Sequence, residues 1–236
     1  NNNLPKDGIL GINIGPNKES TNFAEDYRIA ASCLASLGDY ITINISSPNT
    51  PGLRKLQENS YLEDVIDSTF KGVSIFKKRT PVFLKISPDI SLKKLEKIIY
   101  LAIKKKISAL IISNTSIQRS RELLSINKDE IGGISGNPLF IHSTKLLEQA
   151  RIISKGNIGL IGVGGISSAN QAYIKILVGA NLIQVYTGLI YNGPKMAFNI
   201  LEGLSKLLKR DGFRSISDAV GILDFKNAMK IKNLNF

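Results

Sequence analysis

The stretch Tyr40-Ile-Thr-Ile-Asn-Ile45 runs directly into Ser46-Ser-Pro-Asn-Thr-Pro-Gly-Leu-Arg54. In its first part, apolar side chains alternate with other residues, which predicts a β-strand. Its second part is rich in polar residues, proline and glycine, which predicts a loop. A strand that ends abruptly in such a loop is how α/β enzymes place reactive groups at the carboxyl edge of a parallel sheet. Core packing does not require this order of residues, so we interpret the segment as a candidate site.

Short apolar runs alternate with helical patterns along the whole chain. The predicted strands are Ile9–Ile14, Tyr40–Ile45, Val82–Ile86, Ala109–Ile112, Ile158–Val163 and Leu182–Val185. Strands that are apolar on both faces and alternate with helices indicate a parallel sheet with right-handed crossovers. No composition shift or flexible linker divides the chain, so we expect one α/β domain over residues 1–236.

Three segments carry the clearest helical pattern. The first begins at an N-cap, Ser91, and ends in three lysines; its predicted buried face consists of Leu92, Leu95, Ile98, Ile99, Ala102 and Ile103. The second begins near Ser143. The third follows Ser167-Ser168 and stops at Gly179, which suits the position just after a helix.

The composition excludes several classes of protein and of site. With 43% hydrophobic residues, the chain has no apolar run near the ~18 residues of a membrane span and no visible signal peptide. Cys33 and His142 are each the sole residue of their type, which excludes an intramolecular disulfide and a multi-cysteine metal site. We therefore expect no metal site, and a general base that is not a histidine. Cys33 lies in a helical pattern, so we expect it to be a small core residue.

The net charge of +12 raises the question of a nucleic-acid partner. The basic residues form short runs at the ends of helical patterns, such as Lys104-Lys105-Lys106 and Lys209-Arg210, where cations complement the helix dipole. None of these runs is interleaved with aromatic residues. We therefore expect no nucleic-acid partner. The positive electrostatic field of the chain would instead attract an anionic cofactor, an anionic substrate or a lipid surface.

Polar or glycine residues lie near the carboxyl end of five predicted strands, and the sixth ends in Tyr186, Thr187 and Gly188. On the first five strands they are Asn13 and Gly15, Asn44 and Ser47, Lys85 and Ser87, Asn114 and Thr115, and Gly164 and Gly165. In a (β/α)8 barrel this rim carries the active site, and the last two strands often bind phosphate. Six strands do not close an eight-stranded barrel, and the chain opens at Asn1 instead of Met, so we expect that an N-terminal part is missing.

Three of these features each allow a functional and a structural interpretation. Lys85, in a strand otherwise suited to burial, is either a cation beside an electron-rich cofactor or a side chain reaching past the strand end to solvent. Gly162-Val-Gly-Gly-Ile166 is either a phosphate-binding turn or a sterically tight one. Ser47 has no histidine placed by sequence to activate it, and is a general base, a substrate donor or the start of a turn.

Taken together, several motifs closely resemble class 2 dihydroorotate dehydrogenase, the quinone-linked flavoenzyme of pyrimidine synthesis. The resemblance runs from about Gly8 to Gly221 in the family's order and spacing. Its motifs are Gly11-Ile-Asn-Ile-Gly15, Asn44-Ile-Ser-Ser-Pro-Asn-Thr-Pro-Gly-Leu-Arg54, Lys85-Ile-Ser-Pro-Asp89, Ser113-Asn-Thr115, Gly132-Gly-Ile-Ser-Gly136, Ile161-Gly-Val-Gly-Gly165 and Gln184-Val-Tyr-Thr187. The resemblance implies a (β/α)8 TIM barrel that holds FMN at its carboxyl rim.

The resemblance also implies a role for each matching residue. Ser47 would remove the C5 proton of dihydroorotate while hydride leaves C6 for the flavin, giving orotate. The expected cofactor-binding residues are Asn13, Asn44, Lys85, Ser113, Gly136, Gly164, Gly165, Tyr186 and Thr187. The expected substrate-binding residues are Asn44, Asn49, Asn114 and Thr115. The loop after Ser47, stiffened by Pro48 and Pro51, would be a lid.

The family pattern contains parts that this sequence lacks. Two strands precede the Gly11–Gly15 element in the family, and amphipathic helices ahead of them form a quinone tunnel at the membrane. We therefore expect the last six βα units of the barrel, with the first two strands missing. The expected setting is peripheral, at the cytoplasmic face of the inner membrane, with a membrane quinone as electron acceptor. The alternative is a truncated, catalytically inactive remnant of the family.

Overall fold

The structure is a computed structural model that describes most of the chain. The described residues are 8–17, 19–47, 59–77, 79–119 and 123–233, and the side chains of 59, 60, 232 and 233 lie outside the description.

Six parallel strands form one sheet, in the order in which they occur along the chain. They are β1 (Gly11–Ile14), β2 (Tyr40–Asn44), β3 (Val82–Ile86), β4 (Ala109–Ile112), β5 (Gly159–Gly162) and β6 (Leu182–Ile183). Each strand pairs with the one before it, as in a singly wound barrel wall, so every carboxyl end reaches the same edge. The prediction of a parallel α/β sheet is confirmed.

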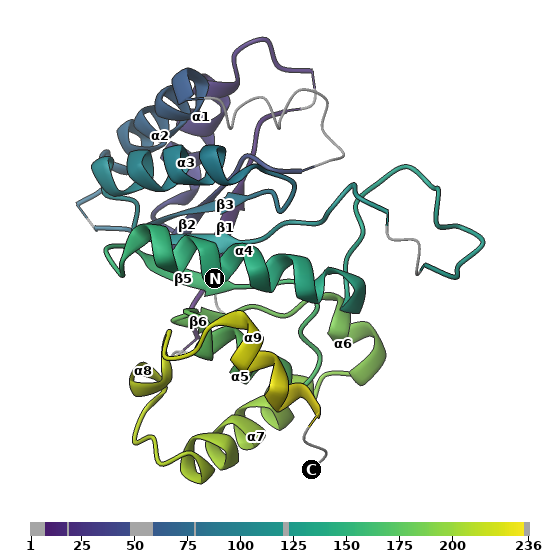
Figure 1. The fold of residues 1–236 in the computed structure, drawn as a ribbon. Coiled ribbons are helices and arrows are strands. Elements are labelled where there is room, and N and C mark those ends of the chain that lie inside the picture. The colour runs from purple at the N-terminus through teal and green to yellow at the C-terminus, as the bar shows by residue number, and fades with distance from the viewer. Residues whose placement is uncertain (1–7, 18, 48–58, 78, 120–122, 234–236) are drawn as a thin grey trace.

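The connections between the strands are helical. The long helices are α1 (Phe23–Leu34), α2 (Asn59–Val73), α3 (Leu92–Lys104), α4 (Phe140–Ser154), α5 (Ala169–Leu177) and α7 (Met196–Arg210). The shorter ones are η2 (Asn137–Leu139), α6 (Thr187–Asn192), α8 (Ile216–Ala219), α9 (Phe225–Ala228) and η3 (Met229–Asn233). Figure 1 shows α1, α2, α3 and α4 lying side by side along the sheet, with α5, α7 and α9 grouped beyond them.

Side chains that alternate along each strand divide the sheet into two different faces. On β2 and β3, the residues Ile41, Ile43 and Leu84 are fully buried and belong to the main core under the helices. Ala109, Ile111 and Ile161 form a separate, smaller apolar cluster with Phe83 and Val163. Successive residues of a strand point to opposite faces, so this second cluster lies on the face away from the helices.

The register of the strands aligns the polar ends of that second face. Asn44 on β2 pairs with Lys85 on β3, and Lys85 pairs in turn with Ile111 on β4. On the same face, Phe83 lies two residues before Lys85 and Tyr40 four residues before Asn44, and their rings stack with centroids 4.6 Å apart. This face is therefore apolar toward the amino ends of the strands and polar at the carboxyl rim.

Two of the three helix predictions hold at their boundaries. Ser91 caps α3 by accepting a hydrogen bond from the Lys94 N–H, and Ser168 caps α5 in the same way from Gln171. Gly179, with a φ of 133°, follows the end of α5 as expected. The helix expected to begin near Ser143 was placed too late: α4 begins at Phe140, directly after the 3-10 turn η2.

Three expected core positions are wrong. On α3, Leu95, Ile98, Ile99 and Ala102 are buried, whereas Leu92 and Ile103, at the two ends of the helix, are exposed. Cys33 on α1 is exposed as well. The buried stripe of each helix is narrower than its apolar pattern, because a helix on a sheet makes contact along one line only.

Tyr27 ties α1 to the functional edge of β2. Its side chain is completely buried, and its hydroxyl donates a 2.7 Å hydrogen bond to the backbone carbonyl of Asn44. Burial raises the pKa of the Tyr27 hydroxyl far above its ordinary value, so the group remains a donor. The last residue of β2 is thereby fixed from the helix side.

Replacing Tyr27 with Phe is expected to lower the free energy of unfolding by about 1–2 kcal/mol, because the Asn44 carbonyl loses a buried donor. Urea unfolding followed by circular dichroism measures the change. Tyr100→Phe on the exposed side of α3 is the matched control and should leave the midpoint unchanged. Equal midpoints for both variants would contradict the anchoring role of Tyr27.

Candidate functional site

Two adjoining cavities open at the carboxyl rim of the sheet. The larger, of about 720 Å³, extends from Lys85 along β4 and β5 to the start of α6. The smaller, of about 330 Å³, lies over β1, β2 and β3. The two share Lys85, Asn114, Thr115 and Gln184 in their linings. A long ligand in the larger cavity would therefore place one end beside a small ligand in the other.

The smaller cavity has a connected polar wall built on Asn44, Ser46 and Asn114. Ser46 is completely buried, and its hydroxyl lies 2.9 Å from the Lys85 carbonyl oxygen and 3.1 Å from Asn44 Oδ1. The amide nitrogen of Asn114 donates to Ser46 Oγ at 3.0 Å and to Asn44 Oδ1 at 3.2 Å. These bonds fix the orientation of both asparagine amides.

That orientation matters for what Asn44 can bind. Its Oδ1 accepts from Ser46 and Asn114, while its Nδ2 has no acceptor among the residues that the structure describes. A half-buried amide nitrogen with two unused N–H groups is a donor for a ligand oxygen. Asn44 therefore presents donors, and not acceptors, to the cavity.

Lys85 stands where the two cavities meet. Its side chain is half-buried, and within the described part of the chain its ammonium makes no ion pair or hydrogen bond. Burial lowers the pKa of Lys85 below its ordinary value. A desolvated cation without a protein partner is unfavourable by itself, which is the expected state of a group that pairs with an anionic ligand.

A glycine turn closes the far end of the larger cavity. Gly164 and Gly165 have φ values of 102° and 77°, a region that favours glycine. A Cβ on Gly165 would approach the Phe140 Cβ to 2.5 Å and its backbone to 2.6 Å, so the turn packs directly on the start of α4. Within the described ranges, the N–H groups of Gly164 and Gly165 have no acceptor. Such a turn suits an anion.

The remaining predicted cofactor residues line the wall between Lys85 and the turn. Ser113 is buried, and its hydroxyl donates to the Asn114 carbonyl at 3.0 Å. Gly136 adopts a φ of 76°, and a Cβ there would meet Thr187 Cγ2 at 3.2 Å. Thr187 Oγ1 lies 2.9 Å from Ser135 Oγ, which joins this loop to α6, and Tyr186 lies beside them, largely exposed.

The structure thus gathers nearly all predicted site residues around the two cavities. Ser47 and Asn13 line the smaller one together with Asn44, Thr115 and Lys85. Asn49 and the predicted lid with Pro48, Pro51 and Gly52 lie outside the described residues. The functional roles assigned to these residues remain predictions.

Other parts of the rim were not predicted from the sequence. Ser46 organises the polar wall, yet in the sequence it is only the first of two adjacent serines, and nothing local tells which one faces inward. Gln184 lines both cavities although it was noted only as part of a motif. Arg119, in the loop between β4 and α4, donates hydrogen bonds to the carbonyls of Lys128, Glu130 and Gly132 and so braces that loop.

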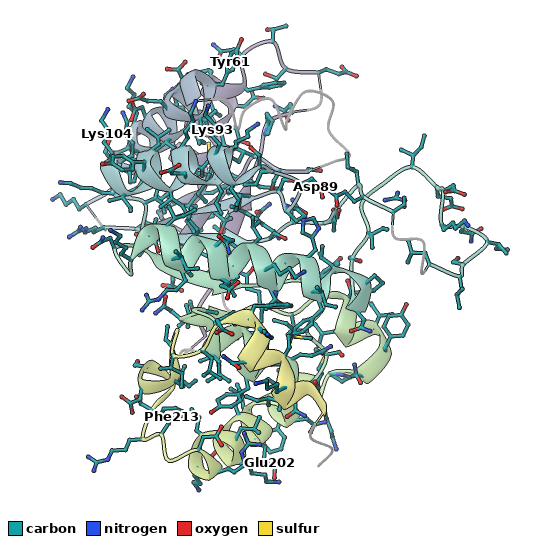
Figure 2. All side chains as sticks on the ribbon, in the orientation of Figure 1. Tyr61, Asp89, Lys93, Lys104, Glu202 and Phe213 are labelled. Carbon is teal, nitrogen blue, oxygen red and sulfur yellow. The ribbon has the colours of Figure 1, made fainter. Side chains whose placement is uncertain are left out.

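The braced loop projects from the body of the molecule between β4 and α4 (Figure 1). Asp89 holds its base: the carboxylate accepts hydrogen bonds from the Ser116 hydroxyl at 2.5 Å and the Ile117 N–H at 2.9 Å. Figure 2 shows Asp89 at the point where this loop leaves the body. Ser116 also pairs with Ile134 across the loop, so both of its ends are fixed beside the larger cavity.

A parallel sheet with the curvature of half a barrel and two cavities at its carboxyl rim place the chain in the class of TIM-barrel-type folds. The family model described as "Dihydroorotate dehydrogenase" matches residues 2–208. The chain belongs to the dihydroorotate dehydrogenase family, in its class 2, quinone-linked branch.

Curated relatives and solved structures agree with this assignment. A dihydroorotate dehydrogenase (quinone) of Parvibaculum lavamentivorans is 44% identical over 214 residues, which cover 91% of this chain and 61% of the relative. A mitochondrial dihydroorotate dehydrogenase (quinone) of Oryza sativa is 43% identical, with 93% and 48% covered. A crystal structure of the Eimeria tenella enzyme in complex with ferulenol superposes with a TM-score of 0.89 at 33% identity, covering 94% of this chain and 64% of that one. The chain thus spans less than two thirds of these proteins.

Replacing Lys85 with Met is expected to raise the free energy of unfolding of the ligand-free chain by about 1 kcal/mol at pH 7, because it removes a desolvated charge. The folded pKa lies below the unfolded one, so between them the unfolded chain binds more protons and wild-type stability rises with pH. The advantage of the variant should therefore shrink toward pH 10. Urea titrations at several pH values measure it, and a variant less stable than wild type at pH 7 would contradict this account.

Proposed function

We propose that this chain carries the FMN-binding and substrate-oxidising centre of a dihydroorotate dehydrogenase. In this proposal the enzyme converts dihydroorotate to orotate for UMP synthesis and passes the electrons to a membrane quinone. The six strands would be the last six of an eight-stranded barrel, within one partial domain over residues 1–236. The enzyme would work peripherally at the cytoplasmic face of the inner membrane.

One observation carries the proposal: the ammonium of Lys85 stands at the junction of the two cavities and pairs with none of the residues that the structure describes. The larger cavity runs from this cation to the turn at Gly164 and Gly165, whose N–H groups lack acceptors in the described part of the chain. An elongated ligand with an electron-rich ring at one end and a phosphate at the other, as in FMN, suits both features. The residues present therefore fit the cofactor that the family implies.

The smaller cavity suits an anionic pyrimidine. Asn44 offers two N–H groups that no described residue accepts, and Asn114 is locked beside it by Ser46. Preorganised donors of this kind bind carbonyl and carboxylate oxygens without reorganising during the reaction. Asn44, Asn114 and Thr115, with Asn49, would hold the substrate at its oxygens.

The proposed reaction removes a proton from C5 and a hydride from C6 of dihydroorotate. Ser47, which lines the smaller cavity, would accept the C5 proton at its oxygen while its own hydroxyl proton passes to water. Bound FMN supplies the two-electron acceptor for the hydride. Lys85 would offset the negative charge that develops between the two ligands, in a site where desolvation strengthens its effect.

Replacing Ser47 with Ala tests the proposal. The purified chain is reconstituted with FMN and mixed anaerobically with dihydroorotate, while flavin absorbance is followed. Wild type should bleach rapidly, and Ser47→Ala should bind FMN equally well but bleach about 10²–10⁴-fold more slowly, since it lacks the base.

Three results separate the possibilities. Bleaching at the wild-type rate in Ser47→Ala would remove Ser47 from the chemistry. Retention of FMN without bleaching in wild type would favour the catalytically inactive remnant, which no present observation favours. Failure to retain FMN at all would contradict the proposal for this chain.

A further inference from the structure

A second buried lysine lies behind the glycine turn. Lys175 on α5 is 0% exposed, and in the described part of the chain no carboxylate contacts it. Burial lowers the pKa of its ammonium well below the ordinary value. Lysine is almost never fully buried without a charged partner, so its place in the core calls for a reason other than packing.

The hydrogen bonds of Lys175 lead to the turn, and its ammonium also lies 5.3 Å from the centroid of the Phe140 ring at the start of α4. Its ammonium donates a 2.6 Å hydrogen bond to Ser143 Oγ and lies 3.5 Å from the Val163 carbonyl oxygen. Ser143 Oγ in turn lies 3.1 Å from the Gly164 carbonyl oxygen. Lys175 thus reaches two successive carbonyls of the turn: that of Val163 directly, beside the Ser113 N–H at 3.2 Å, and that of Gly164 through the Ser143 hydroxyl, which also lies 3.2 Å from the Phe140 carbonyl oxygen.

The carbonyl groups and the N–H groups of the turn have different surroundings. The carbonyls of Val163 and Gly164 bond toward the core, whereas the N–H groups of Gly164 and Gly165 have no acceptor among the described residues. Val163, Gly164 and Gly165 all line the larger cavity. A ligand phosphate on the cavity side would therefore be separated from the ammonium only by the backbone of the turn.

We propose that Lys175 is the buried counter-charge of a phosphate-binding turn and makes this site prefer a flavin with a phosphate over one without. The inference rests on the proposed function, in that it takes the larger cavity to hold FMN. Lys175 is a positioning residue, since it acts on the ligand through Ser143 and the turn. Its charge, set in a region of low dielectric constant, stabilises a dianion whose direct contacts are backbone N–H groups.

A purely structural role would look different. If Lys175 only supported the packing of α5 behind the cavity, its loss would weaken the binding of both flavins, because their ring and ribityl chain lie in the same cavity. A counter-charge acts on the phosphate alone, so its loss changes the ratio of two affinities. FMN and riboflavin share the ring and the ribityl chain and differ only in the phosphate, which makes their affinity ratio the decisive quantity.

The test compares Lys175→Met with wild type by titrating the apo chain with FMN and with riboflavin and following quenching of flavin fluorescence. We expect the FMN dissociation constant of Lys175→Met to rise about tenfold or more, with riboflavin changed less than about twofold. Lys97→Met, which removes an exposed charge from α3, is the matched control for net charge and should leave both constants unchanged.

Other results would overturn the inference. Equal losses for both flavins in Lys175→Met would mean a structural brace, and unchanged constants would mean no role at all. A wild-type chain without preference for FMN over riboflavin would overturn it as well. Should Lys175→Met fail to fold, Ser143→Ala removes the hydroxyl between Lys175 and Gly164 and is expected to reduce the FMN preference about threefold or more; an unchanged preference would count against the inference.

The outcome is distinguishable from that of the proposed function. A phosphate preference that depends on Lys175, in a chain that does not bleach with dihydroorotate, would support the inference and contradict the function. If the flavin bleaches with dihydroorotate but Lys175→Met keeps the preference for FMN over riboflavin, the function is supported and the inference is contradicted.

Discussion

The parallel pairing of β2 with β3 is the constraint on which the rest of this molecule depends. Its register sets Asn44 beside Lys85, and the hydroxyl of Ser46 lies 2.9 Å from the Lys85 carbonyl oxygen across the same pair of strands. Because side chains alternate along a strand, this register also sends Ile41, Ile43 and Leu84 into the core under the helices. A shift of one residue would exchange the two faces and destroy the core and the polar rim together.

Two desolvated lysines place positive charge at different points of the rim. Lys85 faces the cavities, so its charge is available to a ligand ring, whereas Lys175 lies behind the backbone of the glycine turn. Neither has a carboxylate partner in the described part of the chain, and burial lowers the pKa of both. The fold therefore holds positive charge that its own residues do not neutralise. Such charge destabilises the empty protein and stabilises an anionic complex.

The polar wall of the smaller cavity is a network in which most hydrogen bonds join the wall's own residues. Ser46 and Asn114 satisfy each other and Asn44 Oδ1, and Tyr27 fixes the Asn44 backbone from α1. The donors presented to a ligand are therefore rigid before it binds, which lowers the entropy lost on binding. The same rigidity links the stability of α1 and β2 to the geometry of the smaller cavity.

Local sequence was sufficient for the strands, the order of the elements and most of the rim. Apolar runs, N-cap serines and the glycines before α5 are short-range signals, so Ser91, Ser168 and Gly179 were placed correctly, and the motifs led to residues that line one pair of cavities. These signals depend on hydrogen bonds and dihedral angles within a few residues, which a sequence displays directly.

Contacts between distant segments were decided only by the tertiary structure. The exposure of Cys33 and Leu92 follows from how each helix meets its neighbours, and the start of α4 at Phe140 follows from its packing on the glycine turn. The roles of Ser46 and Lys175 depend on partners 68 and 32 residues away. Burial and pairing are properties of the packed chain, so the sequence by itself determined which groups reach the rim, and only the packing decided which of them are left without a partner there.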